Sequence, residues 1–150
     1  MLIVVVIIIV IKVNDLHKRN NMRFTRQRRA ILEEFGKVNT HLTADDIYEK
    51  VRRKMARVSL GTIYRNLEIL ADRGIIRKIE LAGHQKVFDG NTGRHYHLRC
   101  LACDSLVDVA EEKVTIDYST LANDGQFEVT GHRLELVGLC KGCKESAAKV

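Results

Sequence analysis

Four cysteines form two pairs whose spacing is typical of a metal site. Cys100 and Cys103 make the first pair and Cys140 and Cys143 the second, each with two residues between its cysteines. That spacing lets one turn direct both sulfurs at one ion, and four thiolates complete the tetrahedral shell that Zn²⁺ adopts in structural sites. Since such a shell has no open position for a substrate, we predict a structural zinc ion.

Two other kinds of chemistry use paired cysteines. Disulfide bonds are typical of exported proteins, and nothing in the sequence indicates export, so we expect a cytoplasmic protein. A thioredoxin-like redox site needs a single pair on a βα turn. A second pair therefore favours metal binding over both alternatives.

Histidines and carboxylates lie close to the first cysteine pair. His95 and His97 are two residues apart, so on a strand they point to the same face. Asp89 precedes them, and Asp108 follows Cys103 by five residues. Imidazole and carboxylate ligands suit Fe²⁺, Mn²⁺ or Zn²⁺. These four residues together predict a second metal site, although a single histidine of this kind is more often a surface or packed residue than a ligand.

Composition divides the chain into a basic and a mildly acidic part. The 150 residues are 45% hydrophobic and 29% charged, an ordinary globular mixture, with a net charge of +6 and a pI near 9.3. Residues 22–89 hold fifteen basic and nine acidic side chains, whereas residues 90–150 hold seven and nine. The excess of positive charge favours a polyanionic partner for the first part.

The first eleven residues, MLIVVVIIIVI, are an unbroken apolar run. As a helix, these eleven residues would span roughly half of a bilayer core, because a membrane-spanning helix needs about 20 apolar residues. They also lack the preceding positive charge and small-residue cleavage site of a secretory signal. Because Met22 stands where a helical pattern begins, we expect residues 1–21 to be an atypical extension from a mis-assigned start. An extra strand or an interfacial helix is the alternative.

Three helices are predicted between residues 25 and 74. Thr25 can cap the first, which ends at Gly36, and Thr43 begins a capping-box pattern for the second. Ser59 can cap the third, and Gly74 ends it. Two strands are then predicted at residues 75–80 and 85–88. Three helices followed by a hairpin is the order of a winged helix-turn-helix, whose third helix lies in the major groove of DNA.

The polar side chains of the third helix are candidates for reading bases, and the arginines of the first helix for holding phosphates. A solvated helix face or a protein-binding scaffold is the alternative. The predicted DNA-contacting residues are Arg26, Arg28, Arg29, Ser59, Thr62, Tyr64, Arg65 and Asn66.

Three segments together resemble the ferric uptake regulator family: SLGTIYRNL at residues 59–67, HYHLRCLAC at residues 95–103, and the second cysteine pair. The resemblance covers about residues 22–145. It implies an α+β homodimer that is a metal-dependent repressor and not an enzyme. It also implies a winged-helix domain at residues 22–88 for a palindromic operator in double-stranded DNA, and an α/β dimerisation and metal-binding domain at residues 89–150.

The resemblance also assigns the metal ligands. One structural Zn²⁺ per subunit falls on the four cysteines, and one regulatory Fe²⁺ or Mn²⁺ falls on His41, Asp89, His95, His97 and Asp108. His41 precedes the second helix, so one ligand comes from the DNA-binding domain. An ion with ligands from both domains has its full set of ligands in one relative orientation of the domains only. This explains how metal could switch DNA binding.

Asp108 resembles the peroxide-sensing branch, since iron-sensing members usually have Glu there. Arg94 and Tyr96 stand where many iron sensors have further ligands, and only His132 remains of that additional site. This branch implies that Fe²⁺ and hydrogen peroxide add oxygen to His41 or His95 and thereby release the repressor, whereas Mn²⁺ permits DNA binding without this reaction. The alternative is an iron- or manganese-responsive repressor of metal-uptake genes without peroxide chemistry.

Two further classes of protein are open. A mononuclear metal enzyme would need a substrate pocket and a general base, for which the sequence offers no further candidates. A zinc-ribbon interaction module would bind DNA, if at all, without dependence on added metal. We expect no membrane partner and no small-molecule substrate other than peroxide.

Overall fold

The computed structural model describes residues 22–36, 41–80, 86–118 and 128–147. The chain divides into two compact units between Thr92 and Gly93. The predicted extension at residues 1–21 lies outside the described residues. Within the described residues, none of the helices has the length and apolar character needed to cross a membrane.

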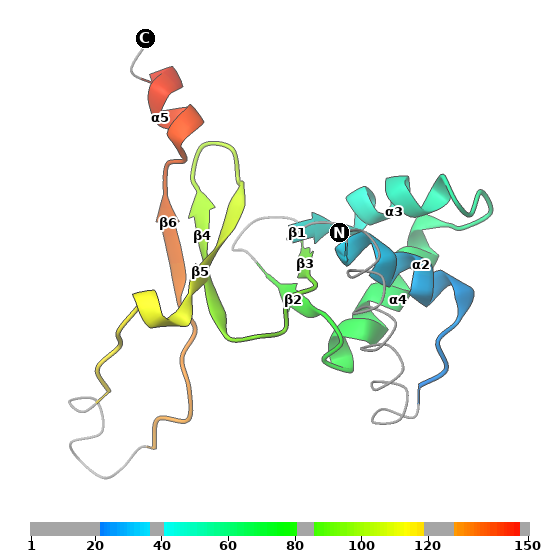
Figure 1. Cartoon of the computed structure of the whole chain (residues 1–150), viewed down its shortest axis with the longest axis horizontal. Coiled ribbons are helices and arrows are strands. Elements are labelled where there is room, and N and C mark those ends of the chain that lie inside the picture. The colour runs from blue at the N-terminus through cyan, green and yellow to red at the C-terminus, as the bar shows by residue number, and fades with distance from the viewer. Residues whose placement is uncertain (1–21, 37–40, 81–85, 119–127, 148–150) are drawn as a thin grey trace. The chain divides into compact units, whose positions relative to one another are not determined.

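The described residues of the first unit form three helices and a small antiparallel sheet (Figure 1). The sheet order is β1-β3-β2, so β3 pairs with both neighbours. This is the arrangement of a winged helix with one strand more than the predicted hairpin. The elements are α2 (Arg26–Phe35), β1 (His41–Thr43), α3 (Ala44–Arg52), α4 (Leu60–Asp72), β2 (Arg77–Ile79) and β3 (Val87–Asp89).

Side-chain caps set the starts of the three helices, as predicted. The hydroxyls of Thr25 and Ser59 accept from backbone N–H groups of α2 and α4. At α3, Thr43 Oγ1 accepts from the Asp46 N–H at 3.1 Å, and Asp46 Oδ2 accepts from the Thr43 N–H at 3.0 Å. Gly74 follows α4 with φ of +65°, a left-handed conformation that glycine adopts without strain.

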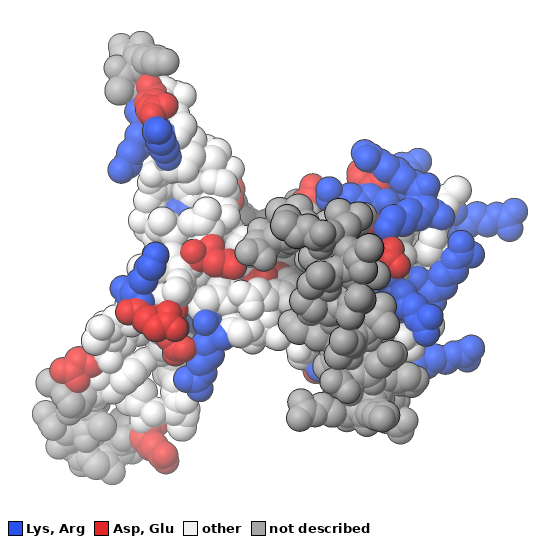
Figure 2. Space-filling view, viewed as in Figure 1, with Lys and Arg blue, Asp and Glu red and all other residues white. Residues whose placement is uncertain are grey.

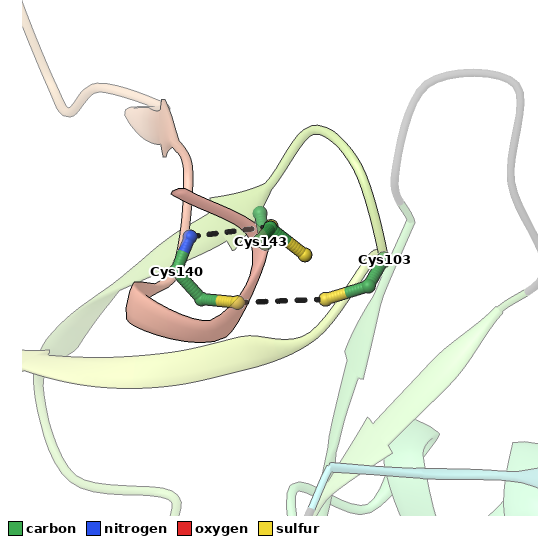
Figure 3. A group of neighbouring side chains, drawn as sticks. Cys103, Cys140 and Cys143 are labelled. Atoms are coloured by element: carbon green, nitrogen blue, oxygen red, sulfur yellow. Dashed lines mark hydrogen bonds between the residues drawn. The ribbon is translucent and has the colours of Figure 1, made fainter. Parts of the chain in front are cut away.

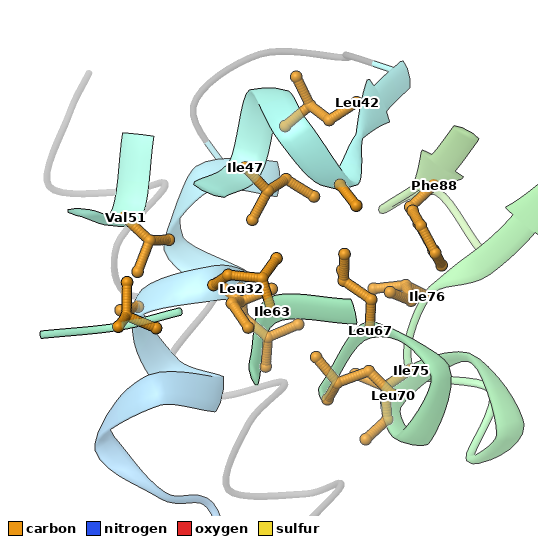
Figure 4. Close-up of a cluster of buried hydrophobic side chains, with 14 of the residues drawn as sticks. Leu32, Leu42, Ile47, Val51, Ile63, Leu67, Leu70, Ile75, Ile76 and Phe88 are labelled. Atoms are coloured by element: carbon orange, nitrogen blue, oxygen red, sulfur yellow. The ribbon is translucent and has the colours of Figure 1, made fainter. Parts of the chain in front are cut away.

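The core of the first unit lies between the helices and the sheet (Figure 4). Its apolar side chains recur at helical spacing along α4, where Ile63, Leu67 and Leu70 are fully buried. Phe88 of β3 is also fully buried, and it pairs with Leu42 in the register of β1. The core therefore fixes β1 and β3, which carry His41 and Asp89.

The second unit is built on a three-stranded sheet of order β5-β4-β6. The central strand β4 pairs antiparallel with β5 and parallel with β6 (Figure 1). Its elements are β4 (His95–Cys100), β5 (Leu106–Ala110), the 3₁₀ turn η1 (Glu111–Lys113), β6 (Glu135–Gly138) and α5 (Lys141–Ala147).

The division of the chain falls four residues later than the predicted boundary between residues 88 and 89. Asp89 is the last residue of β3 and is paired with β1 and β2, so it belongs to the first unit. The sequence had placed it with the metal-binding half.

Replacing Thr43 by alanine removes one half of the capping box of α3. We expect the free energy of unfolding to fall by about 1 kcal/mol, measured by urea denaturation of the full chain. Thr115→Ala is the matched control, since Thr115 is exposed outside any helix or strand, and it should change stability by less than about 0.5 kcal/mol. Equal losses in the two variants would contradict the cap.

Candidate metal centres and nucleic-acid interface

The parallel pairing of β4 with β6 brings the two cysteine pairs together. Cys100 ends β4 and lies opposite Gly138 of β6, two residues before Cys140. Each of the four cysteines offers a sulfur, and these sulfurs lie within 4.8 Å of one another. Figure 3 shows the sulfurs of Cys103 and Cys140 directed at each other, 3.8 Å apart and not joined as a disulfide. This grouping is compatible with a four-thiolate metal site.

Hydrogen bonds shift the thiol pKa values of Cys100 and Cys143 in opposite directions. The backbone N–H of Cys140 donates to Cys100 Sγ at 3.3 Å and, with further backbone N–H groups, lowers the pKa of Cys100 to about 6. The neighbouring sulfurs of Cys140, Cys103 and Cys100 raise the pKa of Cys143 to about 12. Thiolates this close repel one another, so all four can ionise together only around a cation.

The second unit also groups His95, His97 and Asp108. The two histidines occupy one face of β4, and the β4–β5 register places Asp108 directly opposite His97. The His95 and His97 Nε2 atoms are 2.9 Å apart. Asp108 Oδ1 lies 3.6 Å from His95 Nε2 and 3.8 Å from His97 Nε2. The strand alternation predicted for the histidines is confirmed.

The ring of His95 is oriented by the backbone. Its Nδ1 lies 2.8 Å from the carbonyl oxygen of Gly93. With Nδ1–H donating to that oxygen, Nε2 carries the lone pair and faces His97. A hydrogen bond of this kind fixes the tautomer of a metal-ligating histidine.

The first unit holds His41 and Asp89 on adjacent strands, where they are register partners. Asp89 is buried, and its Oδ1 accepts from the backbone N–H of Asn91 at 2.7 Å. That bond fixes the carboxylate and leaves its second oxygen as the metal-ligating candidate. Each unit therefore contributes a preorganised set of ligand types suited to a divalent first-row metal.

A tyrosine–histidine cluster stands where a further metal ligand was considered. His132 Nε2 lies 2.8 Å from the hydroxyl of Tyr96, and its Nδ1 is hydrogen-bonded to the hydroxyl of Tyr118. Both ring nitrogens of the exposed His132 are thus hydrogen-bonded to tyrosine hydroxyls. No sequence pattern pointed to Tyr118.

On α4, the structure separates the predicted base-reading residues. Arg65 is exposed, whereas Thr62 and Tyr64 are half-buried, and Tyr64 packs against the core. Ser59 is the cap residue, with its Oγ 2.9 Å from Thr62 Oγ1.

The prediction that Asn66 lies on the outward face of α4 is wrong, since Asn66 is only 7% exposed. Its amide donates to the carbonyl of Thr62 at 2.8 Å and accepts from Arg28 Nε at 3.1 Å. Arg28 also donates to the carbonyl of Arg23 at 2.7 Å. These two predicted DNA-contacting residues instead connect α2 to α4, because a buried amide needs partners.

The other two predicted arginines of α2, Arg26 and Arg29, are exposed. Lysines and arginines gather over α2 and the segment after α3 in Figure 2. The first unit thus presents a basic surface of the kind that binds nucleic acid.

The wing, which is the hairpin of β2 and β3, is joined to α4 by ion pairs. Glu68 accepts from Lys78 of β2 at 3.1 Å and from Lys86, next to β3, at 3.3 Å. Burial favours the neutral carboxyl, but the bonds from both lysines outweigh it and lower the pKa of Glu68. Glu68 is therefore used within the fold, where it joins α4 to Lys78 and Lys86.

Replacing Arg28 by methionine keeps the aliphatic packing but leaves the Asn66 carbonyl without its donor. We expect the free energy of unfolding to fall by about 1–3 kcal/mol, measured by urea denaturation. Arg29→Met at the exposed neighbouring position is the control and should change stability by less than about 0.5 kcal/mol. A loss confined to DNA affinity, with unchanged stability, would show that Arg28 has no structural role.

Comparison with known proteins shows the family of the chain. The sequence model of the Ferric uptake regulator family matches residues 19–137. The peroxide-responsive repressor PerR of Staphylococcus epidermidis is 35% identical over 128 residues, which is 85% of each chain.

Two solved structures share the fold. The Helicobacter pylori ferric uptake regulator, described with three functional metal-binding sites, superposes with a TM-score of 0.74 at 21% identity over 91% of each chain. The Vibrio cholerae ferric uptake regulator has a TM-score of 0.68 at 27% identity, over 85% of this chain and 98% of its own. The chain therefore belongs to the ferric uptake regulator family, whose members are metal-responsive, DNA-binding transcriptional regulators and not enzymes.

Proposed function

We propose that this protein is a homodimeric, cytoplasmic repressor that binds a palindromic DNA operator when metal-loaded and senses hydrogen peroxide by oxidation of a ligand histidine. The observation that supports it best is the set of His95, His97 and Asp108 on one face of β4 and β5. The similarity to a peroxide-responsive repressor at 35% identity favours the peroxide-sensing branch over an iron sensor.

The regulatory ion, Fe²⁺ or Mn²⁺, is proposed to take ligands from both units. His41 and Asp89 come from the first unit, and His95, His97 and Asp108 from the second. Asp89 and His95 are six residues apart, so the chain holds their Cα atoms within about 20 Å of each other. An ion shared in this way would favour one relative orientation of the units and so one DNA-binding state.

The sensing reaction would alter the protein itself. Bound Fe²⁺ would supply the reactivity that splits the O–O bond of peroxide beside its ligands. In the net reaction, a ring C–H of His41 or His95 becomes C–OH, and hydrogen peroxide becomes water. The modified ring is a poorer ligand, so the metal leaves and DNA is released.

The four cysteines are proposed to hold one structural Zn²⁺ per subunit. A closed shell of four thiolates suits this ion and leaves no position for a substrate. Zinc at this place would connect the end of β4 to the start of α5.

DNA and a second copy of the chain are the proposed partners. Base contacts are assigned to Arg65, with Thr62 and Tyr64 beside it and Ser59 at the helix start, and phosphate contacts to Arg26 and Arg29. A dimer would cover the large exposed apolar side chains of the described residues, all of which lie in the second unit: Leu101, Val107, Val129, Val137 and Leu139.

Peroxide sensing predicts a metal-specific modification. Zinc-replete protein is loaded anaerobically with Fe²⁺, exposed briefly to dilute peroxide, and digested for peptide mass spectrometry. We expect one added oxygen on the peptide containing His41 or His95, together with loss of binding to duplex DNA.

A parallel sample loaded with Mn²⁺ is the control and should stay unmodified and DNA-bound. If neither histidine gains oxygen while DNA binding still depends on added metal, the protein is an iron- or manganese-responsive repressor without peroxide chemistry.

The zinc assignment predicts a stoichiometry. Purified protein should contain one zinc per chain by elemental analysis, and Cys103→Ser should lower this content and destabilise the second unit. Ser146→Ala serves as the control on α5, where the exposed Ser146 hydroxyl donates to the Gly142 carbonyl oxygen at 2.9 Å. Full zinc retention by Cys103→Ser would exclude the four-thiolate site.

A further inference from the structure

The end of α3 and the segment that joins it to α4 are strongly basic. Between residues 50 and 57 the sequence KVRRKMAR contains five basic side chains and no acidic one. We refer to residues 53–59, between the end of α3 and the first residue of α4, as the helix-turn-helix turn. It directly precedes the N-terminus of α4, the end of a recognition helix that contacts bases.

The helix-turn-helix turn is firmly attached to the first unit. Val58 is buried, and Met55 packs against the core. The backbone N–H groups of Lys54 and Met55 donate to the Val51 carbonyl, and that of Val58 donates to the Met55 carbonyl at 3.0 Å. With these apolar side chains inside, the basic side chains of the turn stand on a fixed backbone.

Two of the five basic side chains are neutralised within the fold. Lys54 Nζ lies 2.8 Å from Glu33 and 2.9 Å from Glu34, whose side chain is only 4% exposed. Arg52 lies 3.3 Å from Glu49 and stacks over the Tyr48 ring. Lys54 therefore connects the turn to α2 through these two ion pairs.

The remaining three, Lys50, Arg53 and Arg57, are exposed. Throughout the described ranges 22–36, 41–80, 86–118 and 128–147, no acidic group lies within ion-pair distance of them. An external anion can bind these charges without breaking an ion pair among the residues that the structure describes.

The wing differs in this respect. Lys78 lies 3.1 Å from Glu68 and 3.2 Å from Glu80, and Lys86 lies 3.3 Å from Glu68. A phosphate that binds either lysine competes with a carboxylate already in place. The charge pattern therefore favours the turn over these wing lysines as a phosphate contact.

A surface pocket connects the turn to α2. It has a volume of about 540 Å³, and its lining includes Lys54 and Met55 from the turn, Arg23 before α2, and Arg26 and Arg29 of α2. Arg53 and Arg57 flank Lys54 in the sequence outside this lining, and Figure 2 shows a concentration of Lys and Arg on this side of the first unit.

We propose that Arg53 and Arg57, supported by Lys50, bind the phosphates of duplex DNA beside the groove that α4 enters, and thereby extend the phosphate-binding surface of Arg26 and Arg29. This rests on the proposed DNA-binding function. The contacts position the protein and carry no base preference.

The test is the salt dependence of binding to a random-sequence 30-base-pair duplex, followed by fluorescence anisotropy with zinc-replete, Mn²⁺-loaded protein. Each lost phosphate contact reduces the slope of log K against log [salt] by about 0.9. The double variant Arg53→Ala/Arg57→Ala should reduce the slope by about 1.8 and weaken binding on the order of tenfold near physiological salt.

The matched control is Lys113→Ala/Arg133→Ala, which removes two exposed positive charges from the second unit. This control should leave the salt slope unchanged if direct phosphate contact by Arg53 and Arg57, and not the net charge of the protein, determines the slope. Arg53→Lys/Arg57→Lys keeps both charges and should retain most of the slope. Zinc content and the urea midpoint of each variant confirm folding.

The outcomes separate the two proposals. If loaded wild-type protein binds no duplex, the proposed function fails and this surface with it. If wild-type protein binds but the Arg53→Ala/Arg57→Ala variant keeps the wild-type salt slope, the turn is not a phosphate-binding surface. The same conclusion follows if the salt slope of the Lys113→Ala/Arg133→Ala control falls by the same amount. In both cases DNA binding itself stands.

Discussion

Alternation along one strand underlies both candidate metal centres of the second unit. Strand β4 is hydrogen-bonded on both edges, so its register is fixed twice, by β5 and by β6. The same six residues place His95 and His97 on one face and Cys100 at the end of the strand. Because side chains alternate with a period of two, a shift of one residue would turn both histidines away from Asp108 and displace Cys100 from Cys140. The two centres therefore share one structural dependence.

Charge in the first unit is organised by whether it is already paired. Acidic residues neutralise the bases that join elements together: Glu68 holds the wing lysines to α4, and Glu33 with Glu34 holds Lys54 to α2. Among the described residues, Lys50, Arg53 and Arg57 have no such acidic partner and are exposed. A polyanion can bind there without disturbing the pairs that define the fold, which reconciles a stable small domain with a high density of positive charge.

Local signals made much of this fold predictable. The caps at Thr25, Thr43 and Ser59 bond to groups three residues away, so both partners are visible in the local sequence. The spacing of two between His95 and His97 places both on one face of any strand. Strand β1 was missed because three residues contain too little alternation to be recognised, and its partner lies more than forty residues away. His41 could be assigned only through the family resemblance, for the same reason.

Asn66 shows a different limit of sequence reasoning. Its polarity indicated the outward face, yet it lies beside the apolar residues Ile63, Leu67 and Leu70, and its amide is satisfied by Arg28. A polar residue at the margin of an apolar stripe can belong to either side, and only the partner across the helix interface decides. The same applies to His132, whose two tyrosine partners lie at distant positions in the sequence.

The parallel pairing of β4 with β6 has a consequence for the assembly of the second unit. The strands are joined by a connection of 34 residues that includes β5 and η1, and closing an unstructured loop of that length would cost at most about 3 kcal/mol of chain entropy. A metal ion held by both cysteine pairs closes that loop at its two ends, so binding free energy offsets the entropy of closure. Because β6 pairs with β4, an ion at the cysteine site would also support the strand that carries His95 and His97.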